Sequence, residues 1–183
     1  MNRTYTALTY AAALGSATAG GTLFAFSTFV MKGLARLPHP QGLAAMQSIN
    51  VTATSPGVFA VLLGTAAASV PLAIHAFREP GETARPLLLA GSALFLVGTF
   101  AVTGAYHVPR NEALAKVDPA SAQAPALWQT YVADWTRMNH VRTAAGLAAA
   151  AFFIAALAAD AKPGSAATSF SRSAGRAIPA ATG

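Results

Sequence analysis

The feature that most constrains this chain is the length of its uncharged stretches. Residues 4–31 and 86–109, which are 28 and 24 residues long, contain no Asp, Glu, Lys or Arg. A helix of about 20 residues already spans the roughly 30 Å of hydrocarbon in a bilayer. Two further apolar stretches, residues 57–77 and 143–159, lie farther along the chain. The sequence therefore predicts four membrane spans, near residues 5–31, 57–77, 86–106 and 140–159.

The composition leaves no obvious room for a separate soluble domain, because charged residues make up 10% of the chain and apolar residues 54%. We expect one all-α integral membrane domain, residues 1–160. It would be an antiparallel four-transmembrane-helix bundle with a polar cap of loops and short helices on one side. Small residues four apart, which allow helices to approach closely, are Ser16 and Gly20, Gly64 and Ala68, and Gly146 and Ala150. Residues 161–183, rich in Ala, Ser and Gly with scattered basic residues, are expected to be disordered.

Charge and cysteine content limit the cellular location and the chemistry that the sequence allows. With four spans both termini share one side, and the positive-inside rule favours the cytoplasm for them, in a bacterial inner membrane. The net charge of +6 fits anionic lipid headgroups, and no aromatic-basic pattern indicates nucleic acid. The absence of cysteine excludes disulfides and thiol chemistry. Residues 17–19 alternatively resemble a signal-peptide cleavage site, although the apolar stretch continues beyond them.

Polar residues gather on the membrane side opposite the termini. The first connection there contains Met46, Gln47 and Asn50 and includes a predicted short helix over residues 44–51. The second follows His107 and contains Asn111, and Pro109 is expected to end the third span. Such a cap over an apolar cavity suits a planar aromatic ligand with a few hydrogen-bonding oxygens. The bilayer and a hydrophobic aromatic small molecule are therefore the expected partners, while the oligomeric state is open.

The segment at residues 128–142, WQTYVADWTRMNHVR, continues directly into the last apolar stretch. At about 100° per residue, its large and polar side chains share one arc of a helix roughly a quarter-turn wide. One face of this helix is thus predicted to carry the functional residues. The alternative is that these aromatic and Arg side chains only anchor the helix at the membrane interface. The residues on this arc are Trp128, Tyr131, Trp135, Asn139, Arg142 and Gly146.

Four ordered motifs resemble the anthrone oxygenase-like membrane family over nearly all of residues 15–159. They are GGTLFAFSTFVMKGLARLP, GLAAMQSIN, VPRNEALAKVD and W-x-x-Y-x-x-x-W-x-x-x-N-H-x-R. Lys32 stands where relatives often have proline. The named chemistry of this family comes from fungal and bacterial polyketide pathways. By this resemblance, the family's polar positions are matched by Asn111, Trp135, Asn139, His140 and Arg142, and its first-loop pattern by Ser27, Met46, Gln47 and Asn50.

The resemblance implies an oxygenase-like enzyme that oxidises an anthrone- or quinone-like aromatic molecule with dioxygen. This oxidation can proceed without a cofactor. Such a reaction needs a base and stabilisation of the resulting anion. His140 is the candidate base, with His107 or Asp134 as substitutes. Asn139 and Arg142, with Asn111, would complete the catalytic set, although His140 points about 100° away from their face on an ideal helix. Substrate contacts would come from Trp128, Tyr131, Trp135, Met46, Gln47, Asn50 and Ser27.

Two other interpretations remain. His39, His107 and His140 share one side and would bind copper or iron if they met in space, although no short ligand spacing supports this. A non-catalytic scaffold or accessory protein would use its Trp and His side chains only as anchors. A cavity beneath Trp135, Asn139 and Arg142 would favour a ligand site, whereas solid packing there would favour a scaffold.

Overall fold

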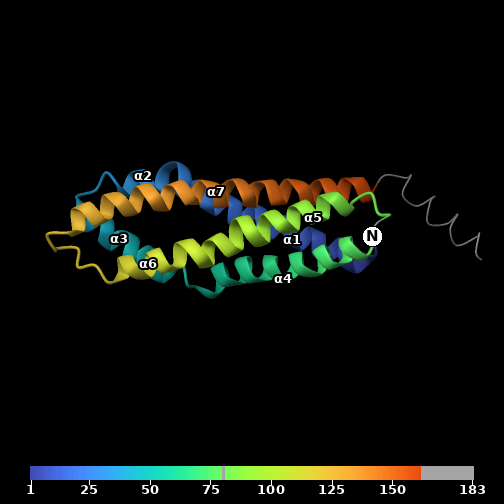
Figure 1. Cartoon of the computed structure of the whole chain (residues 1–183), viewed down its shortest axis with the longest axis horizontal. Helices are drawn as coiled ribbons and strands as arrows, with labels where there is room; N and C mark the ends of the chain where they lie inside the picture. The colour runs from blue at the N-terminus through green and yellow to red at the C-terminus, as the bar shows by residue number, and fades with distance from the viewer. Residues whose placement is uncertain (80, 162–183) are drawn as a thin grey trace, which may run out of the picture.

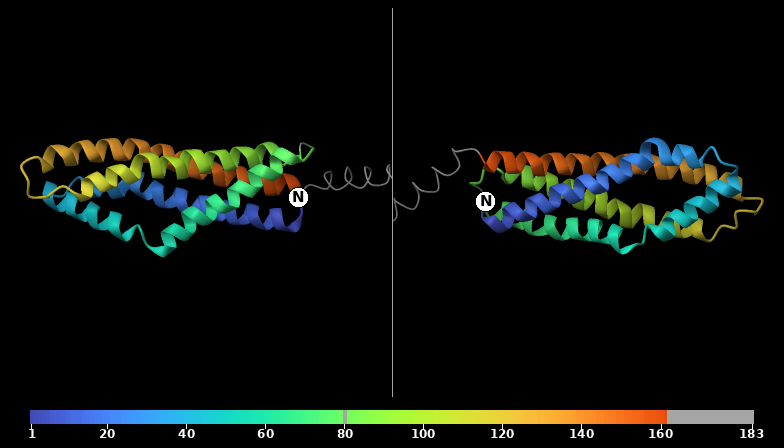
Figure 2. Two further views of the ribbon diagram at one scale, coloured as in Figure 1. Left: turned by 60° about the horizontal axis from the view of Figure 1, so that its bottom comes forward. Right: turned by 180° about the vertical axis from the view of Figure 1, so that it is seen from behind.

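The computed structural model, which describes residues 1–79 and 81–161, confirms the predicted all-α membrane bundle. Its helices form one elongated bundle in which α7 runs along the whole length (Figure 1). The N-terminus and the end of α7 lie together at one end, and α2, α3 and α6 lie at the other (Figures 1 and 2). The elements are α1 (Arg3–Ala25), η1 (Phe26–Val30), α2 (Met31–Leu34), α3 (His39–Thr52), α4 (Pro56–Arg78), α5 (Arg85–Ala93), η2 (Leu94–Ala101), η3 (Thr103–His107), α6 (Val108–Ala115) and α7 (Ala124–Asp160).

In the described part of the chain, four helical segments are long and apolar enough to cross a membrane: Arg3–Leu34, Pro56–Arg78, Arg85–Ala115 and Ala124–Asp160. Each contains one of the predicted spans. Three of them, at 31 to 37 residues, are much longer than the roughly 20 residues that a bilayer requires, and their extra length extends the bundle at the end away from the termini (Figure 1). This extension, which we call the cap, consists of α2, α3, α6 and the first half of α7. The tail expected to be disordered lies, from residue 162 onward, outside the described residues.

Prolines mark where several helices begin. Pro40, Pro56, Pro86 and Pro125 all lie in the first turn of a helix, where the missing N–H costs no hydrogen bond and the fixed φ is already helical. Pro109 occupies the same place in α6. Pro109 was expected to end the helix of the third span, and this expectation was wrong, because η3 continues into α6 without a break. A π-helical turn such as the one before Pro109 is wider than an α-helical turn and leaves more room for a proline ring.

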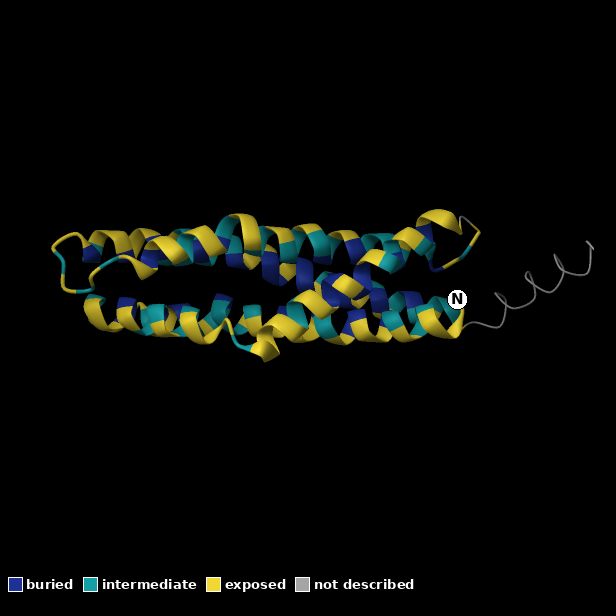
Figure 3. Cartoon of the chain, turned by 90° about the horizontal axis from the view of Figure 1, so that it is seen from below, coloured by how far each residue is buried: buried dark blue, intermediate teal, exposed yellow. Residues whose placement is uncertain are grey.

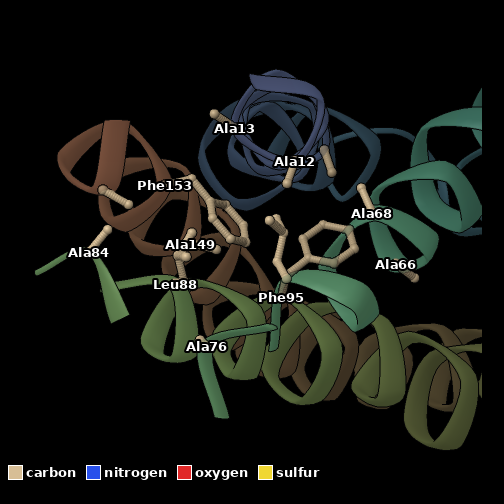
Figure 4. Close-up of a cluster of buried hydrophobic side chains, with 13 residues drawn as sticks. Ala12, Ala13, Ala66, Ala68, Ala76, Ala84, Leu88, Phe95, Ala149 and Phe153 are labelled. Atoms are coloured by element: carbon tan, nitrogen blue, oxygen red, sulfur yellow. The ribbon is translucent and has the colours of Figure 1, made fainter. Parts of the chain in front are cut away.

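The membrane half of the bundle has a core of small residues around a few large ones. Phe95 and Phe153 are fully buried among alanines of α1, α4 and α7 (Figure 4). Buried residues line the inner faces of the helices and exposed residues the outer faces (Figure 3). An added Cβ on Gly20 would meet the backbone of Leu147 at 2.9 Å, so α1 and α7 approach closely there. Gly64, in contrast, is exposed with no atom near it, so its small-residue pair does not mark a contact.

Three π-helical segments interrupt the first and third of these long helices. They are η1, η2 and η3, and all three pack against α7. π-helical turns are rare and occur frequently at functional sites, because one extra residue in a turn redirects side chains. Here they supply Ser27, Thr99, Thr103 and His107, which are polar side chains turned toward α7. The irregular turns therefore position a polar layer inside the bundle.

Candidate functional site

The predicted arc on α7 faces the interior. All six residues, Trp128, Tyr131, Trp135, Asn139, Arg142 and Gly146, are buried. Trp128, Tyr131 and Trp135 form an aromatic group in the cap. Asn139 and Arg142 form a polar group one to two turns farther along α7. Both groups contact the other helices through hydrogen bonds and ring packing.

The aromatic group centres on Asn111 of α6. Tyr131 donates its hydroxyl hydrogen to Asn111 Oδ1 over 2.8 Å, and Trp135 Nε1 donates to the same oxygen over 3.1 Å. The Trp128 and Tyr131 rings stack with centroids 5.8 Å apart. Together with Met31, Leu43, Met46 and Leu114 these rings form a second hydrophobic core. Asn111 thus joins α6 to α7 inside the cap.

The polar group centres on Asn139, which is 0% exposed. Its Nδ2 donates to Leu23 O and to Ser27 Oγ, each over 2.8 Å, and so connects α7 to α1 and η1. Its Oδ1 accepts from Arg142 Nη2 over 2.7 Å. Both N–H groups of the Asn139 amide and one of the two Oδ1 lone pairs are therefore engaged by protein.

Arg142 lies beside Asn139 and is 5% exposed. Its Nη1 donates to Thr103 Oγ1 over 3.2 Å, and its guanidinium carbon lies 5.1 Å from the centre of the Trp135 ring. Its Nε is buried and has no hydrogen-bond partner among the described residues. Asp134 instead pairs with Arg137, and Asn111 accepts from Tyr131 and Trp135.

His107 is the buried histidine of this region. Its Nε2 lies 3.3 Å from Trp135 O and its Nδ1 lies 3.4 Å from Val102 O. Its ring meets the Trp135 ring edge-on at 5.1 Å. Since both nitrogens face carbonyl oxygens, the imidazole is engaged with the backbone of two helices.

The first-loop residues also make contacts within the protein. Gln47 Nε2 donates to Leu114 O and Val117 O, each over 2.9 Å, which caps the end of α6. Met46 is buried in the cap core, and Asn50 Nδ2 is buried without a partner among the described residues. Ser27 Oγ lies 3.0 Å from Thr143 Oγ1 in the polar group. The structure therefore places these candidate substrate contacts in the interior.

His140 lies on the other side of α7. It is exposed, as the helical angle predicted, and it lines a groove of about 370 Å³ between α2 and α7. Cavities of roughly 300 to 1,000 Å³ are typical of small-molecule sites. The residues that line the groove are Met31, Lys32, Ala35, Val132, Ala133, Thr136, Arg137 and His140.

The groove combines an apolar floor with a basic rim. Met31, Ala35, Val132 and Ala133 are apolar, while Lys32 and Arg137 bring positive charge from opposite helices. Asp134 pairs with Arg137 across 3.0 Å, but the Arg137 side chain remains 72% exposed. The five α7 residues recur at the spacing of one helix face. Sequence reasoning did not anticipate this groove, because Lys32 and Arg137 are 105 residues apart and only the packing of α2 on α7 joins them.

The three histidines proposed as metal ligands do not meet. His107 is buried against Trp135, His140 lies in the groove, and His39 begins α3. Within residues 1–79 and 81–161 no three His, Asp or Glu side chains are placed to hold a metal ion. His75, at the termini end, stacks on Tyr5 and hydrogen-bonds Glu82 over 3.0 Å.

Comparison with known proteins assigns the family. The family described as Anthrone oxygenase matches residues 53–152, more than half of the chain. This range includes Asn111 and the whole α7 segment from Trp128 to Arg142. No curated protein and no solved structure matches the chain. Four membrane-type helices and this match together identify the chain as a member of the anthrone oxygenase family.

Proposed function

We propose that this protein is a membrane-embedded oxygenase that oxidises a flat, anthrone-like aromatic molecule with dioxygen. The observation that carries the proposal is the groove, in which His140 and two cationic side chains surround an apolar floor. The family name supports the reaction class. The groove differs from the interior arc in one decisive respect, because it is open and can admit a ligand.

The groove lies where such a substrate would be found. His140 is 20 residues before Asp160, so it lies about 30 Å along α7 from the end of the bundle that holds the termini. If the hydrocarbon layer, which is about 30 Å thick, begins at that end of the bundle, His140 would lie near its opposite edge. Val132 and Ala133 extend the apolar floor outward from there. A lipophilic aromatic molecule with polar oxygens also collects at this boundary.

The chemistry requires a base and positive charge. Neutral His140 would accept a proton from the ring methylene, and the electron-rich anion that remains would pass an electron to dioxygen. Lys32 and Arg137 would stabilise the oxyanion. In the complete reaction, one atom of dioxygen becomes the new carbonyl oxygen. The other leaves as water with both methylene hydrogens, so no external reductant is needed.

This assignment gives the interior arc a different role from the one first expected. Asn139, Arg142 and Asn111 would support α7 and orient the groove, rather than touch the substrate. We also propose that the reaction uses no bound metal, that the termini face the cytoplasm, and that the membrane is a bacterial inner membrane.

The hydrogen bonds that tie Asn139 and Arg142 of α7 to α1 and η3 favour a second candidate, a non-catalytic small-molecule-binding or scaffold protein. Side chains that hold helices together are what such a protein requires. The two candidates share the groove and differ only in turnover, so an activity measurement separates them.

The test is oxygen consumption and quinone formation by the purified protein in detergent, with a simple anthrone as substrate and metal content determined on the same sample. We expect turnover above the spontaneous rate, and a decrease of about 100-fold in His140→Gln, the usual effect of losing a general base. His39→Gln is the matched control, because His39 lies on the same side of the membrane but does not line the groove. No turnover above the spontaneous rate would support the binding protein, and stoichiometric copper or iron would contradict the metal-free reaction.

A further inference from the structure

The interior contains a positive charge that the proposed reaction does not use. Arg142 is 5% exposed and lies 18 residues before Asp160, about 27 Å along α7 and therefore within the hydrocarbon thickness. A guanidinium stays protonated in proteins, and a charge buried at this depth is costly unless something compensates it.

No acidic side chain provides that compensation. The six Asp and Glu residues of the chain all lie in the described part, and none is within 4.0 Å of the Arg142 nitrogens. The carboxylates that form ion pairs are Glu82, Asp134 and Asp160, with the N-terminus, His75 or Arg137 as partners.

The groups around Arg142 are neutral. Nη1 and Nη2 donate to Thr103 and Asn139, and the Trp135 ring lies 5.1 Å from the guanidinium carbon. These contacts satisfy part of the hydrogen-bonding capacity but supply no negative charge. These two bonds use two of the five guanidinium N–H groups, and Nε is the nitrogen that is buried without any acceptor among the described residues.

We propose that Arg142 binds a small monovalent anion, with Nε as its donor. The site lies where η1, η2 and η3 pack against α7, beside Thr103, whose Oγ1 accepts from Nη1 and donates to Thr99 O. A bound anion would neutralise the guanidinium and complete its hydrogen bonding. Because the anion binds only the folded protein, it would also stabilise the fold by mass action.

The first experiment is a chloride titration of the wild-type protein, purified without halide in gluconate. Thermal unfolding is followed by tryptophan fluorescence while chloride replaces gluconate at constant ionic strength. We expect the midpoint to rise by about 3 °C for each tenfold increase in chloride above the dissociation constant. Arg142→Gln should remove this dependence, whereas Arg110→Gln, which changes a cation of α6 held over Tyr106, should retain it.

A second measurement needs no variant. Iodide quenches tryptophan at contact, and of the two tryptophans, both in the described part of the chain, Trp135 is the one whose ring lies near the Arg142 guanidinium. Saturable quenching that chloride reverses would support the site. A midpoint that does not change with chloride, or that changes equally in both variants, would overturn the proposal, as would quenching that is only linear in iodide. Stabilisation by an aromatic carboxylate but not by chloride would overturn it too, because the occupant would then be an organic ligand.

Discussion

His140 and Arg142 are two residues apart on α7 and face opposite surroundings. His140 is exposed in the groove between α2 and α7, whereas Arg142 is buried and hydrogen-bonded to Asn139 and Thr103. One face of α7 therefore holds the bundle together, and another lines the groove. Substitutions on the two faces should affect different properties of the protein.

Asn139→Ala should destabilise the fold by about 3 kcal/mol. The substitution removes the hydrogen bonds from Asn139 to Leu23 O and Ser27 Oγ, and it removes the acceptor of Arg142 Nη2. A buried polar group that is left unpaired costs about 1 to 3 kcal/mol. Thermal or denaturant unfolding in detergent measures the effect. His140→Ala, one residue away and exposed, should change stability by less than about 0.5 kcal/mol. Equal losses in the two variants would contradict the division of α7 into two faces.

The double variant Lys32→Ala, Arg137→Ala should lower kcat/KM for an anthrone by about 10- to 100-fold. Both cations line the groove, and each charge-assisted hydrogen bond to an oxyanion is worth about 1.5 to 3 kcal/mol before solvent screening. Steady-state kinetics on membrane or detergent samples gives the ratio. The control is Arg36→Ala, Lys116→Ala, which removes the same charge from exposed sites of the cap outside the groove. A similar loss in this control would point to general electrostatics rather than to the groove.

Gly20→Ala should destabilise the bundle by about 1 to 3 kcal/mol. The new Cβ would lie 2.9 Å from the backbone nitrogen of Leu147, and α1 and α7 cannot separate there without losing packing. Gly21→Ala has no atom within 4 Å of its added Cβ and should stabilise the helix by up to about 1 kcal/mol. Unfolding midpoints of these neighbouring variants should therefore shift in opposite directions, and a shift in the same direction would refute the close approach.

Much of the fold follows from patterns within single segments. The uncharged stretches predict the four spans, and the spacing of Trp128, Trp135, Asn139 and Arg142 predicts their shared buried face. The same angle places His140 on a different face. These predictions succeed because a helix in a membrane satisfies its own backbone hydrogen bonds, so its length and periodicity depend little on other segments.

The features that sequence reasoning missed depend on contacts between segments. Pro109 looks like a helix end until the π-helical turn before it is known. The hydrogen bonds of Asn111 to Tyr131 and Trp135, and of Gln47 to the end of α6, likewise join residues far apart in the sequence. The groove requires α2 to lie against α7, and no local pattern around Lys32 contains that information.

The most direct test of the groove as the oxidation site is the rate of quinone formation after Ala133→Phe. Ala133 is exposed and lines the groove, so a phenyl ring there would fill it and leave His140 in place. Ala144→Phe is the control, since Ala144 is an exposed residue of the same helix outside the groove. We predict that Ala133→Phe abolishes turnover while Ala144→Phe retains the wild-type rate. Wild-type turnover by Ala133→Phe would contradict the groove as the site of the reaction.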